Sequence, residues 1–160
     1  MLFTAQLRGD YSMIVKGPWN ICQVRDFLDE AKIPLRIACQ GSSGHPIIAS
    51  LWCLREGDRL WCATQEDSSL AKLIGRDNKC AFEVSLESPP YRGVRGPGLA
   101  SLHPERGAEI LRALIERYHG RTDSRFAGLL LDRAETEVAV QIEPQNFLTW
   151  DFDKRMKDPG

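Results

Sequence analysis

The sequence predicts a mainly β fold with added helices, in the α+β class and of the barrel type. Short apolar runs alternate with turns rich in Gly, Pro and Asp, which is typical of antiparallel strands. Residues 51–63 are apolar on both strand faces, and a sheet with one face in water does not show that pattern. The chain has 160 residues, 42% of them hydrophobic, which suffices for a buried core. We expect one domain over residues 1–160, with its core at about 20–155.

The first helix is expected from Asn20 to Ala31. Its apolar residues recur at helical spacing, and Pro34 stops further propagation. The next segment, LRIACQGSSGHPIIASLWCLREGDRLWCAT, reads as three short strands separated by GSSGHP and by the tight turn EGDR. The sequence therefore predicts a strand meander after the helix.

The EGDR turn predicts the register of a hairpin. If Gly57 and Asp58 form a two-residue loop, the pairs are Glu56 with Arg59, Leu54 with Trp61, and Cys53 with Cys62. One face then carries Leu51, Cys53, Leu60 and Cys62, and the other carries Trp52, Leu54, Trp61 and Ala63. Because both faces are apolar, a helix or a second subunit outside a closed barrel has to cover the outer one.

Helices and strands alternate in the rest of the chain. A short helix follows a cap at Asp67 or Ser68 and ends at Gly75, and NKCAFEVSLE is a half-exposed strand. PPYRGVRGPGLASL is a glycine-rich strand, after which a longer helix begins at Pro104 and ends at Gly120. SRFAGLLLD reads as a short helix, and ETEVAVQIEPQNFLTWDF reads as two strands. The total is about six or seven strands and three or four helices.

Composition and motifs exclude several classes of function. The formal net charge of −1 and the scattered Lys and Arg argue against nucleic acid or a membrane as partner, so we expect a small-molecule ligand. The segment MLFTAQLRGDYSMIVKGP resembles neither a signal peptide nor a membrane span, and we expect a cytoplasmic protein. No nucleophile elbow, Walker A loop or dinucleotide-binding turn occurs.

The five cysteines and three histidines predict neither a metal site nor a disulfide framework. The cysteines form no C-x-x-C pair, and no Cys/His cluster is present. Cys53 and Cys62 could approach each other across the hairpin, although a reducing cytosol would keep them as thiols. The histidines lie far apart in the chain, and no catalytic residue is identified.

One candidate anion site lies at the start of a helix. Thr64, Ser68, Ser69 and Lys72 follow a strand, where free N–H groups, hydroxyls and an ammonium would suit a phosphate. The alternative is a capped surface helix, in which Ser68 satisfies a backbone N–H.

A second candidate anion site contains Arg92 and Arg95. These arginines project from the glycine-rich strand, which a phosphate could approach closely. The alternative is a strand face in contact with solvent.

The order of these segments resembles that of a known family. A short helix, PLRIACQGSSGHPIIASLWCL, GDRLWCATQEDSSLAKLI, a strand through Phe82, YRGVRGPGLA, a helix and a late TWDF are similar to the pyridoxamine 5'-phosphate oxidase-like family of FMN-binding split β-barrels. The resemblance covers roughly residues 21–155. It implies a six-stranded antiparallel split β-barrel with peripheral helices, a homodimer, and flavin mononucleotide (FMN) in a cleft between the subunits.

The resemblance also implies site residues. In this family the strand after the G-x-P turn contacts the flavin ring through backbone groups, which here are those of Ala49, Ser50, Leu51 and Trp52. The end of the next strand and the following helix start hold the phosphate, at Thr64, Ser68 and Ser69. Lys72, Arg92 and Arg95 are not part of the family pattern, and they are this chain's own candidates to replace a missing cation at the phosphate. Relatives commonly have a cation where this chain has Leu70, and the oxidase proper has an arginine where Ala49 lies.

The function implied is that of an FMN-dependent oxidoreductase, which transfers hydride to or from a small molecule. One alternative keeps the fold and binds a deazaflavin coenzyme or haem, for which His45 is the histidine nearest the expected cleft. Another alternative is a non-catalytic dimer that binds a small molecule.

Overall fold

The computed structural model describes residues 13–157. Its strands are β1 (Val15–Lys16), β2 (Leu35–Gln40), β3 (Pro46–Leu51), β4 (Leu54–Glu56), β5 (Arg59–Gln65), β6 (Lys79–Ser85), β7 (Arg92–His103), β8 (Glu137–Pro144) and β9 (Phe147–Asp151). Its α-helices are α1 (Ile21–Glu30), α2 (Ser69–Arg76), α3 (Gly107–His119) and α4 (Arg125–Leu131). Short 3-10 helices occur at Pro104–Arg106, Ala134–Thr136 and Asp153–Arg155.

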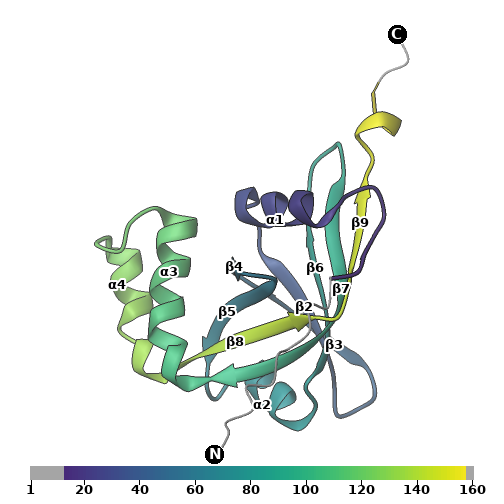
Figure 1. The fold of residues 1–160 in the computed structure, drawn as a ribbon. Coiled ribbons are helices and arrows are strands. Elements are labelled where there is room, and N and C mark those ends of the chain that lie inside the picture. The colour runs from purple at the N-terminus through teal and green to yellow at the C-terminus, as the bar shows by residue number, and fades with distance from the viewer. Residues whose placement is uncertain (1–12, 158–160) are drawn as a thin grey trace, which may run out of the picture.

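The strands form one curled sheet, almost entirely antiparallel, that makes a half-barrel (Figure 1). Its order is β3–β2–β6–β7–β8–β5–β4, with β9 beside β7 and the short β1 parallel to β9. The predicted α+β barrel class is confirmed. The described residues form nine strands rather than six or seven, because β1 was not foreseen and the expected second strand of the meander is interrupted at Trp52 and Cys53.

The predicted hairpin register is confirmed for β4 and β5. Leu54 pairs with Trp61 and Glu56 pairs with Arg59. Cys53 precedes β4 and is not part of this ladder. The turn requires a positive φ of 63° at Gly57, which a residue with a Cβ rarely adopts.

The helix ends follow the capping residues in the sequence. Asn20 and Gln23 form a capping box at the start of α1, and Ser68 caps α2. Gly120 ends α3 in the left-handed conformation, as predicted. Gly75 was predicted to end α2, but the helix continues one residue further, to Arg76. Its C-cap is Asp77, whose backbone is extended.

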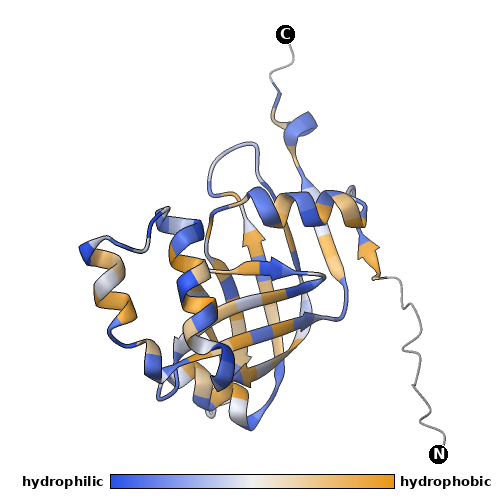
Figure 2. Ribbon diagram, turned by 60° about the vertical axis from the view of Figure 1, so that its left-hand side comes forward, coloured by the Kyte–Doolittle hydropathy of each residue, from blue (hydrophilic) through white to orange (hydrophobic). Residues whose placement is uncertain are grey.

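The inside of the half-barrel is the main core. Strand residues such as Leu35, Ile37 and Ile142 are fully buried there together with apolar residues of α1 and α2. The two helices lie at opposite ends of the barrel (Figure 1). Figure 2 shows hydrophilic and hydrophobic residues alternating along α1, as expected for a helix with one buried side.

Helix α3 covers the outer face of β5 and β8. Trp61 and Ala139 of these strands form a cluster with Ile110 and Leu114 of α3, and Trp61 is only 4% exposed. The sequence left open whether a helix or a second subunit covers this face, and within the described residues a helix does so. The outer face that carries Trp52 and Trp61 is therefore covered without a second subunit.

The glycines of β7 allow neighbouring strands to approach closely. A Cβ at Gly96 would overlap the carbonyl oxygen of Asn146, and one at Gly93 would meet the carbonyl oxygen of Val84 at 2.6 Å. The close approach predicted for this strand is thus made by the protein's own backbone.

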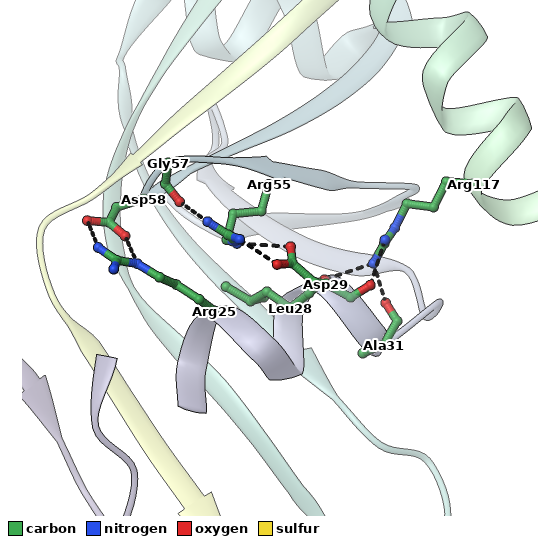
Figure 3. A network of polar contacts seen from close by, with 8 residues as sticks. All are labelled: Arg25, Leu28, Asp29, Ala31, Arg55, Gly57, Asp58 and Arg117. Carbon is green, nitrogen blue, oxygen red and sulfur yellow. Dashed lines mark hydrogen bonds and ion pairs between the residues drawn. The ribbon is translucent and has the colours of Figure 1, made fainter. Parts of the chain in front are cut away.

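Arginines connect α1 to the β4–β5 hairpin and to α3 (Figure 3). Arg25 forms a bidentate ion pair with Asp58, with N–O distances of 2.8 and 3.0 Å, and Arg55 forms an ion pair with Asp29. Arg117 donates to three carbonyl oxygens at the end of α1, those of Leu28, Asp29 and Ala31. The positive charge of Arg117 also interacts favourably with the negative, C-terminal end of the α1 helix dipole.

None of the helices in residues 13–157 is long and apolar enough to cross a membrane.

Candidate functional site

Two hollows at the surface contain residues predicted for the site. The first, which we call the α2 hollow, has about 550 Å³ and is lined by Gly41, Ser42, Ser43, Ile47, Ser69, Lys72, Leu73 and Arg76. The second, the Trp52 hollow, has about 320 Å³ and is lined by Ser50, Leu51, Trp52, Ala63, Leu111, Leu114, Phe126, Leu130 and Glu137. Strand β3 contributes to both, through Ile47 in the first and through its C-terminal end in the second.

The α2 hollow has the donors of an anion site. Lys72 and Arg76 stand one helical turn apart on α2, and both are exposed. Neither forms an ion pair within the described part of the chain. The hydroxyls of Ser42, Ser43 and Ser69 line the same hollow. Sequence reasoning found Ser69 and Lys72, but it missed Arg76 and the two serines of GSSGHP.

Ser68 acts as a helix cap, so the capping interpretation of this segment is confirmed. Its Oγ accepts the N–H of Ala71 at 3.1 Å, and Thr64 Oγ1 lies 3.1 Å from it. Thr64 and Ser68 do not line the α2 hollow. A phosphate-binding role for Thr64, Ser68 and Ser69 stays a prediction.

Leu70 occupies the position at which the family resemblance implies a cation, and this position is part of the core. Leu70 is 8% exposed and packs with Leu73 and Ile74 inside the barrel. A charged side chain could not replace it there without losing solvation. Lys72 and Arg76 are the cations that α2 does offer to the hollow.

The Trp52 hollow is apolar and has a rigid wall. The rings of Trp52 and Tyr118 are stacked, with centroids 5.0 Å apart and an angle of 9° between planes, and Phe126 lies edge-on to Trp52. The Tyr118 hydroxyl donates to the carbonyl of Ile33 at 2.8 Å and accepts the N–H of Cys53 at 3.2 Å. Burial raises the pKa of Tyr118 to about 12, so the hydroxyl stays protonated at neutral pH.

Glu137 is the one titratable residue that lines the Trp52 hollow. Its Oε1 accepts a hydrogen bond from Gln65, and its Oε2 is buried without a hydrogen-bond partner among the described residues. Burial is the main cause that raises the pKa of this carboxyl group. No sequence signal separates Glu137 from the exposed Glu135 nearby, because its burial depends on how α3 and α4 pack.

The remaining predicted residues lie elsewhere. Arg95 is on the outer sheet face, with its guanidinium 5.3 Å from the ring centre of Trp150. Arg92 lines a separate hollow with Trp19 and Asp151. Ala49 is partly buried against the core. One chain alone therefore does not gather the ten predicted residues into one site, and their cofactor contacts stay predictions.

All five cysteines are free thiols. Cys53 and Cys62 are both buried in the core, and burial raises the pKa of each. Cys39, not foreseen as a partner, stands opposite Cys80 across β2 and β6. No group of three or more Cys, His, Asp or Glu suited to a metal ion occurs in residues 13–157.

Comparisons with known proteins identify the fold through structure, since no family profile and no curated protein matches the sequence. The conserved hypothetical protein Rv2991 from Mycobacterium tuberculosis matches with a TM-score of 0.74 at 22% identity, over 89% of this chain and 94% of that one. An F420 reductase matches with a TM-score of 0.64 at 20% identity, over 76% and 94%. A candidate pyridoxamine 5'-phosphate oxidase from Listeria innocua matches with 0.62 at 14% identity, over 82% and 97%. The chain has the pyridoxamine 5'-phosphate oxidase-like split β-barrel fold.

Proteins with other cofactors share this split barrel. HutZ, the haem storage protein of Vibrio cholerae, matches with a TM-score of 0.58 at 11% identity, over 79% of this chain and 89% of that one. The flavocytochrome Anf3 of Azotobacter vinelandii matches with 0.61 at 18% identity, over 89% and 75%. At such identities the likeness establishes the fold and not the ligand.

Proposed function

We propose that the protein binds FMN and acts as an oxidoreductase that transfers hydride to or from a small molecule. The observation that carries the proposal is the α2 hollow, where Lys72, Arg76 and three serine hydroxyls converge. Two cations without ion-pair partners beside hydroxyl donors are suited to a phosphate monoester. The fold and its flavin-associated neighbours support the same assignment.

The residues present fit FMN at both of its ends. The α2 hollow would hold the phosphate, with Ser69 at the start of the helix. Residues Ala49 to Trp52 would meet the ring, and the stack of Trp52 on Tyr118 holds the end of that segment in place. When bound, FMN supplies the hydride chemistry, while the protein orients the ring and excludes water from it.

Titration with FMN and with riboflavin tests this proposal. Purified protein is expected to show a flavin spectrum, or to quench FMN fluorescence saturably at micromolar concentration. Riboflavin, which lacks the phosphate, is expected to bind at least about tenfold more weakly because it leaves the cations unpaired. A protein that ignores FMN, or that binds both flavins equally, would contradict the phosphate assignment.

Coenzyme F420, a deazaflavin, is the second candidate. The match to an F420 reductase has a slightly higher TM-score than the match to the Listeria protein. Titration with F420 in parallel with FMN separates the two, since the tighter ligand identifies the cofactor. Haem would instead give a Soret band that changes on replacing His45. If none of the three binds, the non-catalytic alternative gains support.

The outer face of β3, β2, β6 and β7 supports the proposed homodimer. Ile48, Ala38, Ala81 and Pro97 are register partners in one row across these strands, and Ile48 is 68% exposed. The next row contains Arg36, Glu83 and Arg95. An apolar row beside charges of both signs can pair with its own copy about a two-fold axis. We propose that a second copy covers this face.

Replacing Ile48 with Asp is expected to dissociate the dimer. A buried, unpaired carboxylate at the centre of the interface costs several kcal/mol, so light scattering at micromolar concentration should report a monomer. Ile14→Asp is the control, since Ile14 is also exposed and lies outside this row. A monomeric wild-type protein, or a variant that stays dimeric, would refute the proposed interface.

A further inference from the structure

Ser101, His103 and Glu105 form a chain of hydrogen bonds at the surface where β7 ends. Ser101 Oγ lies 2.9 Å from His103 Nε2, and His103 Nδ1 lies 3.0 Å from Glu105 Oε1. Every second side chain of a strand points to the same face, which places Ser101 beside His103. The chain then enters a 3-10 helix at Pro104, and this helix brings the Glu105 carboxylate to the second nitrogen of the imidazole ring.

Glu105 determines which ring nitrogen of His103 carries the proton. The carboxylate accepts a hydrogen bond from its own backbone N–H and another from His103, and both lower the pKa of Glu105. Because an ionised carboxylate only accepts, the neutral imidazole donates its Nδ1–H to Glu105 and keeps a lone pair on Nε2. Ser101 therefore donates its hydroxyl hydrogen to Nε2. This order of hydroxyl, imidazole and carboxylate is the one that activates a serine nucleophile.

The imidazole of His103 is held in place by packing as well as by Glu105. Its ring lies edge-on to Trp61, with the ring centres 5.3 Å apart, and α3 covers Trp61 from outside. The guanidinium of Arg106 lies 4.2 Å from the centre of the Trp61 ring and forms an ion pair with Glu56. These contacts restrict rotation of the imidazole, so Nε2 stays directed toward the hydroxyl group.

The hydroxyl side of this chain is open to a substrate. Ser101 is exposed, and the His103 side chain is 31% exposed. Leu99 lies on the same face of β7 and is an exposed apolar side chain that an acyl group can contact. Gln141 is the register partner of Ser101 in β8, so its amide group projects beside the hydroxyl. An amide N–H in that place can donate to the negative oxygen that develops on an attacked carbonyl.

We propose that this surface hydrolyses small carboxylic esters, with Ser101 as nucleophile, His103 as general base and Glu105 as the residue that positions His103. Ser101 Oγ forms a bond to the ester carbonyl carbon while its proton passes to His103 Nε2. The bond to the alcohol oxygen then breaks, and the alcohol leaves with that proton. Water attacks the acyl-serine through the same base, which releases the carboxylic acid and returns a proton to Ser101. Neither oxidation nor reduction occurs, so the reaction needs no co-reactant other than water.

This activity goes beyond the proposed flavin chemistry and is tested separately from it. Ser101, His103 and Glu105 line neither the α2 hollow nor the Trp52 hollow. Ester hydrolysis is therefore measured on purified protein without added flavin. Failure to bind FMN would leave this inference intact, and absence of ester hydrolysis would leave the FMN proposal intact.

Hydrolysis of 4-nitrophenyl acetate, followed by the release of 4-nitrophenolate, tests the inference. Ser101→Ala and His103→Gln are each expected to lower kcat at least about a hundredfold, the usual contribution of a positioned general base. Glu105→Gln should lower kcat and leave KM unchanged, because a neutral amide does not stabilise the imidazolium that forms when His103 takes the serine proton. An equal change of kcat and KM in this variant would contradict the positioning role of Glu105.

A second Ser–His pair in the chain supplies the matched control. Ser124 Oγ lies 2.9 Å from His119 Nε2, also at the surface. Within residues 13–157, however, His119 forms no ion pair with a carboxylate. His119→Gln is therefore expected to hydrolyse the ester at the wild-type rate. Thermal unfolding checks that each variant is folded.

A fluorophosphonate reagent gives a readout on the wild-type protein that does not depend on turnover or on the folding of a variant. The reagent phosphonylates activated serines with loss of fluoride. Peptide mass spectrometry is expected to find the label on Ser101 and not on Ser124. Wild-type hydrolysis no faster than that of Ser101→Ala, or a label absent from Ser101, would overturn the inference.

Discussion

Replacing Arg117 with Met is expected to lower the free energy of unfolding by about 3 kcal/mol. The guanidinium donates to the carbonyl oxygens of Leu28 and Asp29 at 2.8 and 2.7 Å and to that of Ala31 at 3.0 Å (Figure 3). These are carbonyls at the end of a helix, which lack partners within the helix itself. Without Arg117, α1 loses its polar contact with α3.

Urea unfolding followed by tryptophan fluorescence measures this effect. Arg112→Met is the matched control, since Arg112 is an exposed arginine on the same helix, and its loss should cost less than about 0.5 kcal/mol. Arg117→Lys should fall between the two, because one ammonium cannot reach all three carbonyls in the arginine geometry. Equal unfolding midpoints for the two methionine variants would show that the contacts with α1 do not stabilise the fold.

Much of the fold could be predicted because its determinants are local. The first helix was expected to start at Asn20, which proves to be its cap, while Ser68 caps α2 and Gly120 ends α3 as their residue types imply. The EGDR turn determined the pairing of Leu54 with Trp61. The apolar outer face of that hairpin correctly indicated a cover, although only the structure showed that α3 provides it.

The parts that escaped prediction depend on contacts between distant segments. The two-residue β1 exists only because β9 lies beside it. Gly75 was expected to end α2, but it keeps the helical conformation and the chain turns away two residues later. The glycines of β7 were interpreted as room for a ligand, whereas the backbone of Asn146 occupies the space beside Gly96.

The candidate site was predicted less completely than the fold, for the same reason. Ser69 and Lys72 were found because they share one segment with the helix cap. Arg76 joins them one turn later, while Ser42 and Ser43 come from a loop that only the fold brings to α2. The burial of Glu137 likewise requires α3 and α4, so its sequence surroundings contain no signal for it.

Removing both cations of the α2 hollow, in the double variant Lys72→Met and Arg76→Met, is expected to weaken FMN binding by about a hundredfold or more. Each charge-assisted hydrogen bond to the phosphate contributes about 1.5–3 kcal/mol, and 1.4 kcal/mol corresponds to a tenfold change in affinity. Both side chains are exposed and have no ion-pair partner in the described chain, so their loss should leave the fold stable. Flavin fluorescence titration measures the change.

Riboflavin makes this experiment specific for the phosphate. The double variant should bind riboflavin within about twofold of wild type, because the ring contacts along Ala49 to Trp52 are unchanged. Lys79→Met is the control, since Lys79 is an exposed lysine at the start of β6 that does not line the hollow. If the double variant loses FMN and riboflavin equally, the cations act on the ring or on the fold. If it keeps wild-type affinity for FMN, the phosphate lies elsewhere, and Arg92 and Arg95 become the cations to replace next.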